Sequence, residues 1–218
     1  GFPLEFIVPR ENAEEAALID GIEVYGADSL PELVSALRGE FELPRFAFSF
    51  SRLRLGDENR QADILDLAQV KGQAATKRAL EVAAAGAHNV LMVGPPGSGK
   101  TMLVRRFASI MPSLTLNECL EITNIYSVSG LLPKGRLVLR ERPFRAPHHT
   151  CTAITLVGGG RIPRPGEVSL AHRGVLFLDE LLEFNREALE ALRQPLEDGQ
   201  ITVSRLQTAL TFPCRFSL

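Results

Sequence analysis

Two short apolar runs, separated by about eighty residues, dominate the hydrophobic pattern of this chain. The first, residues 89–93, reads Asn-Val-Leu-Met-Val and leads into a glycine-rich turn. The second, residues 175–178, reads Val-Leu-Phe-Leu and leads into two carboxylates. Continuous apolar runs of this length are typical of strands that are buried on both faces, as in a parallel sheet. We therefore expect two strands of one parallel sheet, each ending in polar residues.

Apolar residues at helical spacing follow the first run. Leu103, Phe107 and Ile110 recur at i, i+4 and i+7, which is typical of a helix with one face on a core. Thr115 and Glu118 have the spacing of a capping box, so we expect another helix to begin there. The pattern also predicts a helix over 77–85, a helix capped by Asn185 with the apolar stripe Leu189, Leu192 and Leu196, and a hairpin of strands at 200–205 and 209–216.

Residues 1–39 carry a separate α/β pattern. Two short strands and two short helices bury little surface by themselves, so we expect this segment to be the end of a larger domain. Each expected helix has a capping pair at its start and a glycine at its end. The expected elements are a strand at 6–8, a helix from Asn12 with Glu15 to Gly21, a strand at 22–25, and a helix from Ser29 with Glu32 to Gly39.

Residues 40–65 are expected to be a linker. Three phenylalanines alternate with small residues between positions 46 and 50, and three arginines flank them. Aromatic rings beside arginines are a surface on which single-stranded bases stack. The same pattern also fits an edge strand that packs against a neighbouring element, which is the commoner structure. The sequence leaves both interpretations open.

The glycine-rich turn is the strongest chemical signal in the chain. Residues 94–101, Gly-Pro-Pro-Gly-Ser-Gly-Lys-Thr, match the phosphate-loop pattern G-x-x-x-x-G-K-[ST], with an expected strand before them and an expected helix after them. In such a loop the backbone N–H groups and the start of the helix surround phosphate oxygens. Lys100 is expected to reach the outer phosphates, and Thr101 to offer its hydroxyl to Mg²⁺.

The carboxylate pair after the second run strengthens this interpretation. Asp179 is placed to hold Mg²⁺ through water, and Glu180 to orient and polarise the water that attacks the phosphate. The pair therefore indicates hydrolysis of the nucleotide, because a protein that only senses a nucleotide has no need of the second carboxylate. A strand that merely ends in an acidic loop is the alternative, and it is the weaker one behind a phosphate loop.

The bulk composition excludes several classes of protein. The 218 residues have a net charge of −2 and ordinary globular proportions, with 45% hydrophobic and 23% charged residues. The three cysteines are far apart and form no C-x-x-C motif, so we expect neither disulfides nor structural zinc, and a location in the reducing cytoplasm. No apolar stretch approaches the roughly twenty residues that span a bilayer, so no membrane is expected as a partner.

Charge is unevenly distributed along the chain. Residues 1–60 hold six basic and twelve acidic side chains, whereas residues 134–173 hold eight basic and two acidic ones. A concentrated basic segment favours binding of a polyanion or of a neighbouring subunit, and the sequence does not decide between them. Within this segment His148 and His149 are adjacent, and on a strand they would point to opposite faces. We therefore expect them to pack or hydrogen-bond rather than to share a metal ion.

Several stretches together resemble the magnesium-chelatase-like branch of the AAA+ ATPases, in particular the ComM/YifB type. The resemblance covers residues 66–218 and is much more specific than a phosphate loop alone. Residues 1–39 are similar to the end of the Lon-protease-like domain that precedes the ATPase in such proteins. The stretches that carry the resemblance are residues 66–73 (DLAQVKGQ), the phosphate loop, 142–150 (RPFRAPHHT), 158–160 (GGG), 163–172 (PRPGEVSLAH), 174–180 (GVLFLDE) and 192–199 (LRQPLEDG).

The resemblance implies a fold and an activity. The fold is a P-loop NTPase (AAA+) three-layer αβα sandwich with a parallel sheet, incomplete at its C-terminal end and preceded by the small α/β remnant. The activity is ATP hydrolysis with Mg²⁺ by a homo-hexameric ring, linked in ComM-type members to DNA branch migration during uptake and recombination. The polar sensor residue, the arginine finger and the helical lid would lie beyond Leu218. We therefore expect the fragment alone to bind ATP weakly and to hydrolyse it poorly.

Roles for individual residues follow from the motifs and the resemblance together. Lys100, Asp179 and Glu180 are the expected catalytic residues, and Thr101 and Asp179 the expected Mg²⁺ contacts. The insertion around residues 158–170 and the hairpin at 200–208 are expected to face the pore of the ring, where Arg161, Arg164 and Arg205 are candidate DNA contacts. The residues expected to contact the nucleotide are Val70, Gly72, Gly94, Pro95, Pro96, Gly97, Ser98, Gly99, Lys100, Thr101 and Met102.

Two further functions remain open from the sequence. One is the motor subunit of a magnesium chelatase, which acts on a porphyrin held by a partner subunit. The Lon-like remnant argues against it, because chelatase motor subunits usually begin near the ATPase. The other is a nucleotide-dependent scaffold without enzymatic activity, against which Glu180 argues.

Overall fold

A computed structural model describes residues 4–17, 21–47, 66–133, 136, 138–160, 163–205 and 208–218 of the chain. The chain divides into two compact units, residues 1–63 and 64–218. Each is described by itself below. Among the described residues, no helix is both long enough and apolar enough to cross a membrane.

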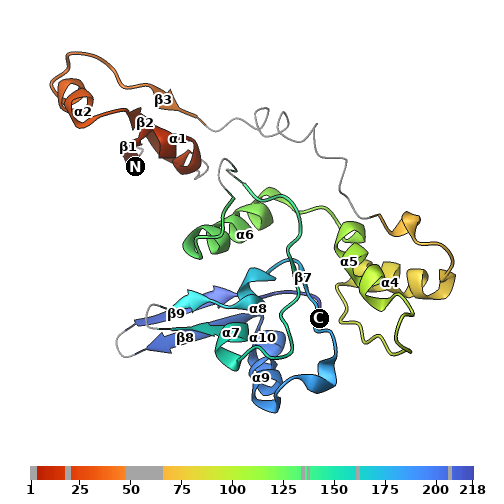
Figure 1. Ribbon diagram of the computed structural model, residues 1–218. Coiled ribbons are helices and arrows are strands. Elements are labelled where there is room, and N and C mark those ends of the chain that lie inside the picture. Colours follow the sequence, from red (N-terminus) through yellow and green to blue (C-terminus); the bar gives the residue numbers. More distant parts are fainter. Residues whose placement is uncertain are drawn as a thin grey trace. The chain divides into compact units, whose positions relative to one another are not determined.

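The described residues of the first unit form a small three-stranded sheet and two helices (Figure 1). Strand β1 (Leu4–Pro9) pairs in parallel with β2 (Ile22–Ala27), and β2 pairs antiparallel with β3 (Arg45–Phe46). Helix α1 (Arg10–Ala16) connects the parallel strands, and α2 (Leu30–Leu37) follows β2. Its small core consists of Ala13, Ala17 and Val24, against which Phe46 packs.

The elements predicted for residues 1–39 are present, but both ends of the first helix differ from the prediction, since it ends at Ala16 and not at Gly21. Helix α1 begins at Arg10, directly after β1, and no side chain caps it, so the predicted start at Asn12 with Glu15 is wrong. The short connection leaves no room for a separate capping residue. The second helix is capped as predicted, because the Ser29 hydroxyl accepts a hydrogen bond from the Glu32 N–H at 3.4 Å. Arg45 and Phe46, at the start of the predicted linker, form β3 as an edge strand, which is one of the two structures left open for this stretch. Phe48 and Phe50 lie outside the described residues.

The second unit contains the parallel strands. Strand β4 (Phe144–Arg145) pairs in parallel with β7 (Val175–Leu176), and Ser217 forms a parallel bridge to Val175 on the other side of β7. Beyond that segment, the Val90 N–H donates to the Leu218 carbonyl at 2.8 Å. The chain near Ser217 therefore lies between the two segments that the apolar runs predicted as strands.

The two apolar runs that were predicted to be strands have different outcomes. The second forms β7 at Val175 and Leu176, which are both buried. Residues 89–93 are not a strand in the structure, contrary to prediction. Leu91 is 77% and Val93 89% exposed, and the one backbone hydrogen bond that joins the described part of this run to the sheet is that of Val90. A strand needs a ladder of such bonds, so an apolar run with one bond stays irregular.

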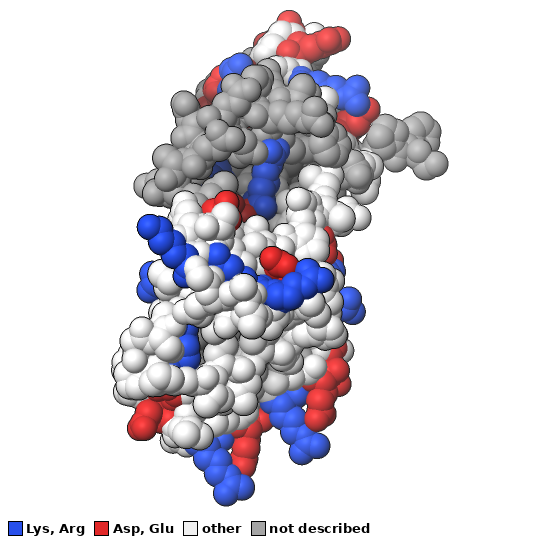
Figure 2. All heavy atoms as spheres, turned by 90° about the vertical axis from the view of Figure 1, so that its right-hand side faces the viewer, with Lys and Arg blue, Asp and Glu red and all other residues white. Residues whose placement is uncertain are grey.

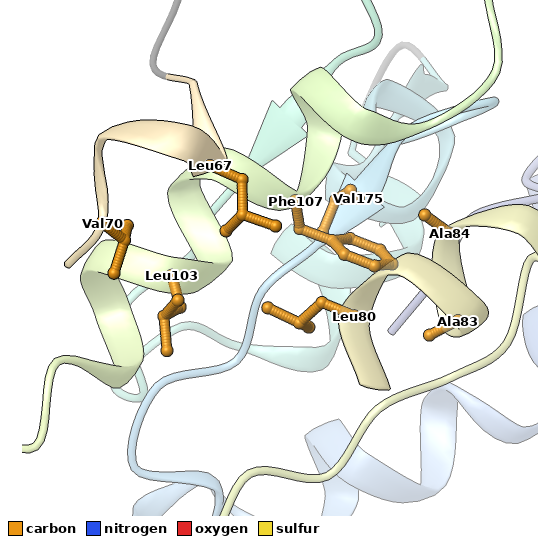
Figure 3. Packing of buried hydrophobic residues seen from close by; sticks show 8 residues of the cluster. All are labelled: Leu67, Val70, Leu80, Ala83, Ala84, Leu103, Phe107 and Val175. Carbon is orange, nitrogen blue, oxygen red and sulfur yellow. The ribbon is translucent and has the colours of Figure 1, made fainter. Parts of the chain in front are cut away.

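Helices cover both faces of β7. Helix α4 (Ala74–Gly86) packs on α5 (Lys100–Ile110), and Figure 3 shows Leu80, Leu103 and Phe107 from these helices meeting Val175. The next residue, Leu176, points the other way, as successive strand residues do, and lies in a second core cluster. That cluster contains Leu156, Val168, Ala171, Leu176, Ala188, Leu192, Ile201 and Cys214. The strand is therefore buried on both faces between helical layers, as its sequence predicts.

The second core cluster is built from short elements and a hairpin. Helices α9 (Arg186–Ala191) and α10 (Arg193–Asp198) replace the single predicted helix, because the chain breaks at Leu192, although Asn185 caps α9 as predicted. The remaining elements are the 3-10 turns η2 (Leu67–Gln69) and η3 (Leu181–Glu183), α6 (Leu116–Val128), α7 (Ala153–Val157), β5 (Gly158–Gly159), β6 (Arg164–Pro165), α8 (Glu167–Leu170), β8 (Gln200–Arg205) and β9 (Thr208–Pro213).

A polar network around one buried histidine joins α6 to the start of β7. Helix α6 has the predicted capping box of Thr115 and Glu118. On the same helix, Glu121 accepts hydrogen bonds from Arg173 at 2.9 Å and from His172 Nε2 at 3.0 Å. The Arg215 N–H donates to His172 Nδ1 at 3.1 Å, so Nδ1 is the unprotonated nitrogen of a neutral ring. The network therefore ties α6, β7 and the segment at Arg215 together through one histidine.

This network predicts a pH-dependent stability. His172 is 2% exposed, and its burial lowers the pKa below the ordinary 6.5, although Glu121 opposes this shift. The unfolded state therefore binds a proton more readily than the folded state, so the His172 contribution is complete above pH 6.5 and is lost as pH falls through the lower folded pKa. We expect the urea midpoint to fall between about pH 7 and pH 5, and the His172→Gln variant to lose this part of the slope.

The exposed His88 gives the matched control. A His88→Gln variant is expected to keep the wild-type pH dependence of the urea midpoint. A His172→Gln variant with the same slope as the wild type would contradict the assignment to His172. The hydrogen bond from Arg173 lowers the pKa of Glu121 below 4.5, so Glu121 also contributes to the pH dependence at more acidic pH. The comparison of urea midpoints is therefore made above pH 4.5.

Candidate functional site

The glycine loop forms a tight turn at the start of α5. Gly97 and Gly99 have φ angles of 76° and 84°, in the left-handed region that side chains disfavour, and the helix begins at Lys100. The first N–H groups of α5 have no helical partners, and the helix dipole places partial positive charge there. The loop is therefore a cradle of backbone donors for an anion, as the motif predicts.

The polar groups of the loop fit a phosphate group. The Lys100 ammonium folds back on the loop and donates to the carbonyls of Gly94 at 2.8 Å and Pro95 at 3.0 Å. The Ser98 hydroxyl oxygen is buried, and no partner is found for it among the described residues. A buried hydroxyl without a partner is costly unless a ligand or water satisfies it. Space is open around Gly97, since a side chain there would meet nothing within 4 Å.

The acidic pair lies against this loop. The Thr101 hydroxyl donates to Asp179 Oδ2 at 3.4 Å, although 78 residues separate them in sequence. Asp179 follows β7, and Thr101 is the second residue of α5, so the sheet and the helix bring the two motifs together. A hydroxyl and a carboxylate are oxygen ligands of the kind that Mg²⁺ prefers. The pair therefore fits a magnesium ion next to the phosphate cradle.

Glu180 points to a histidine that the sequence did not identify as functional. Its backbone is left-handed, with φ of 55°, and its carboxylate lies 3.4 Å from His149 Nδ1. His149 follows β4 in a turn, where its ring packs 4.1 Å from that of His148. The expectation that the two rings point to opposite faces is wrong, because they lie on a turn and not on a strand. The contact places the Glu180 carboxylate against the loop that follows β4, the strand beside β7.

Beside His149 the surface is hollowed. A cavity of about 610 Å³ is lined by the loop from His149 to Ile154 and by residues around Glu183 and Ala188. Among the described residues, no group of three or more His, Cys, Asp and Glu side chains is arranged to hold a metal ion. His148 Nδ1 lies 2.9 Å from the Thr150 hydroxyl, and His149 faces Glu180.

The segment before α4 lies beside the phosphate loop. Gly72 has open space around it, because a side chain built there would meet nothing within 4 Å. Val70, which was also expected near the nucleotide, has a side chain that is 2% exposed and packs in the core of Figure 3. Its carbonyl accepts a hydrogen bond from Lys77. Gly72 and the neighbouring backbone are thus better placed for a ligand than the Val70 side chain.

Some arginines of the basic segment have partners within the fold. Arg145 makes a two-pronged ion pair with Glu167 at 2.6 and 2.8 Å, and Arg173 pairs with Glu118 and Glu121 of α6. Arg142 donates to two backbone carbonyls. Figure 2 shows basic side chains in a band across the middle of the visible face, and basic and acidic side chains together along its lower edge. Two carboxylates from outside 134–173, Glu118 and Glu121, therefore pair with one arginine of the segment, Arg173.

The three candidate DNA contacts have different outcomes. Arg164 is exposed on β6, which pairs antiparallel with β5. A side chain at Gly158 of β5 would come within 3.3 Å of Val203 of β8, so the two hairpins pack together. Arg205 ends β8, and nothing is described of its side chain. Arg161 lies outside the described residues.

Comparison with known proteins shows the family to which the chain belongs. A family model described as magnesium chelatase, subunit ChlI, matches residues 66–218. The chain is 45% identical over 217 residues to the competence protein ComM of Haemophilus influenzae, covering 98% of this chain and 42% of that protein. It is 48% identical over 213 residues to the uncharacterised protein Rv2897c of Mycobacterium tuberculosis, covering 97% of this chain and 41% of that protein. The chain thus spans about two fifths of the length of these relatives.

A solved structure supports the fold. A model of the complex between subunits BchI and BchD of magnesium chelatase contains a chain that matches with a TM-score of 0.50 and 24% identity. The match covers 65% of this chain and 49% of the other. This likeness shows the fold, which is the predicted α/β P-loop (AAA+) architecture with a parallel sheet.

Proposed function

Since the chain belongs to the magnesium chelatase subunit ChlI family, we propose that it binds and hydrolyses ATP with Mg²⁺, as part of a motor that acts on DNA. The observation that carries this proposal is the contact between the Thr101 hydroxyl and Asp179 at the end of β7. It brings a phosphate cradle and two carboxylates to one place, as nucleotide hydrolysis requires.

Each residue of the site has a role in this proposal. The loop from Gly94 to Gly99 holds the phosphates through its N–H groups, and the Lys100 ammonium leaves the Gly94 and Pro95 carbonyls to contact the outer phosphates. Thr101 and Asp179 hold Mg²⁺, which neutralises charge on the phosphates when bound. Glu180 orients the attacking water and accepts its proton, and its contact with His149 sets where the carboxylate points.

The action on DNA rests on two observations. The chain shares 45% identity over nearly all of its length with a protein named for competence, which is the uptake of DNA. Arg164 is exposed on the β5–β6 hairpin, which packs against β8 of the second hairpin. We further propose that the intact protein works in the cytoplasm as a homo-hexameric ring, so that these hairpins line its centre.

DNA-stimulated ATP hydrolysis by the intact protein tests the proposal. We expect single-stranded or forked DNA to raise turnover several-fold, and the stimulation to fall steeply as salt is raised. Arg164→Ala should weaken the stimulation and lower the salt slope by about one, without changing turnover in the absence of DNA. Arg186, which is exposed on α9 and paired with Glu190, gives the matched control, and its Ala variant should behave as the wild type.

Other outcomes would redirect the proposal. Stimulation that appears only with a porphyrin-binding partner, and with no DNA, would make the chain a chelatase motor. An intact protein that does not bind ATP would end the proposal at its first step. The Lys100→Ala variant serves as the reference for lost binding, because the variant lacks the ammonium that contacts the phosphates.

A further inference from the structure

We propose that Gln73 is a positioning residue that sets the geometry of the phosphate loop from outside. Its side-chain amide Nε2 donates to the carbonyl of Ser98 at 2.9 Å, across 25 residues of sequence. Gln73 lies in the segment before α4, not in the loop motif itself. The inference rests on the proposed function, since it concerns how the loop receives a nucleotide.

The geometry of the peptide bond explains how this contact orients the next N–H group of the loop. A trans peptide is planar, so its carbonyl and the next N–H point in opposite directions. When Gln73 holds the Ser98 carbonyl on its own side, the N–H of Gly99 must point to the other side of the same peptide. Holding the Ser98 carbonyl therefore leaves the Gly99 N–H for an anion.

The backbone of Gln73 is specialised for this contact. It has φ of 55° and ψ of 39°, directly after Gly72 with φ of 71°, so two successive residues are left-handed. For a residue other than glycine this conformation costs about 1 kcal/mol or more, and it persists only where surrounding structure determines it. The turn places the Gln73 side chain beside the loop, where a side chain built at Gly99 would lie 3.5 Å from its nitrogen.

The rest of the segment before α4, residues 66–72, contacts helix α5, which follows the phosphate loop. Arg106 of α5 donates to the Asp66 carbonyl at 3.1 Å and to the Gln69 side chain at 3.5 Å. Leu67 and Val70 are buried in the core that α4 and α5 share. These contacts attach the segment 66–73 to α5, and the Gln73 side chain attaches it to the phosphate loop.

Nucleotide affinity of the intact protein tests the inference. Gln73→Met keeps the length of the side chain and removes its donor, so we expect ATP and ADP to bind about tenfold more weakly in fluorescence titrations. Turnover at saturating ATP should change much less than KM. The urea midpoint without nucleotide should stay that of the wild type, because the bond is exposed and the core is untouched. If Gln73 served stability alone, Gln73→Met would lower the urea midpoint and leave the nucleotide affinity unchanged.

Two controls separate the side-chain bond from other causes. Gln69→Met changes the same residue type in the same segment but removes no contact to the loop, so its affinity should equal that of the wild type. Gln73→Asn tolerates the left-handed backbone but is too short to reach Ser98, so it should bind as weakly as Gln73→Met.

Three results are decisive. Wild-type affinity in Gln73→Met, with Lys100→Ala impaired, would overturn the inference and leave the proposed function standing. Wild-type affinity in Gln73→Asn would also overturn it, since the backbone conformation and not the bond would then matter. If the wild-type protein binds no nucleotide, the proposed function fails, and the inference fails with it.

Discussion

Glu180→Gln is expected to lower ATP turnover of the intact protein by a factor of about 10² to 10⁴, with ATP binding retained. Glutamine keeps the size of the side chain and can still face His149, whose Nδ1 lies 3.4 Å from the carboxylate in the wild type. It cannot take a proton from water. The contact between Thr101 and Asp179 is separate and stays intact, so the magnesium position should not change.

Single-turnover hydrolysis and equilibrium ATP binding measure the two effects separately. Glu183 is the matched control, because it is also a carboxylate of the loop after β7 but forms the end of η3, away from Thr101. We expect turnover in Glu183→Gln to stay within about twofold of the wild type, as for a surface change outside the site. Turnover in Glu180→Gln close to that of the wild type would refute the role of Glu180 and favour a nucleotide-dependent scaffold.

The phosphate loop and the acidic pair could be located from the sequence because their signals are local. Gly97, Gly99 and Lys100 lie in one short stretch, and the motif itself encodes the turn and the start of the helix. The apolar residues before Asp179 likewise encode burial on both faces, which Val175 and Leu176 show. Local patterns also gave the capping residues Thr115, Asn185 and Ser29, since capping depends on neighbours within three residues.

Contacts that depend on the path of the chain could not be predicted. His149 meets Glu180 only because β4 and β7 are neighbours, and that pairing brings their following loops together. The exposed run around Leu91 has the composition of a strand, but strand formation depends on a partner that the run itself does not specify.

Counting charges along the sequence missed some acidic partners for a related reason. The arginines of residues 134–173 appear as a basic patch when counted along the sequence, but Glu118 and Glu121 of α6 lie against one of them in space. Gln73 is a comparable case at the site, since its partner Ser98 is one loop and one helix away. Long-range pairs of this kind are decided by the fold, after the local elements have formed.

Gly174→Ala is the substitution with the largest expected effect on stability. A Cβ atom at Gly174 would lie 2.0 Å from the Pro143 carbonyl oxygen, and 2.8 Å from two other backbone atoms of Pro143. Backbone atoms cannot turn aside as the end of a side chain can. The same carbonyl accepts the Val175 N–H at 2.8 Å, so relief of the clash must separate β4 from β7. We expect a loss of about 3 kcal/mol or more in the free energy of unfolding.

Urea unfolding of the intact protein measures this loss, with Gly94→Ala as the matched control. Neither glycine has a positive φ, and a Cβ atom at Gly94 meets only the Ser98 hydroxyl at 3.4 Å, which is an ordinary contact. The control should therefore stay within about 1 kcal/mol of the wild type. Equal stability of the two variants would show that β4 and β7 can move apart without cost. Because β7 positions Asp179 against Thr101, such freedom would also remove the physical basis for a fixed magnesium site.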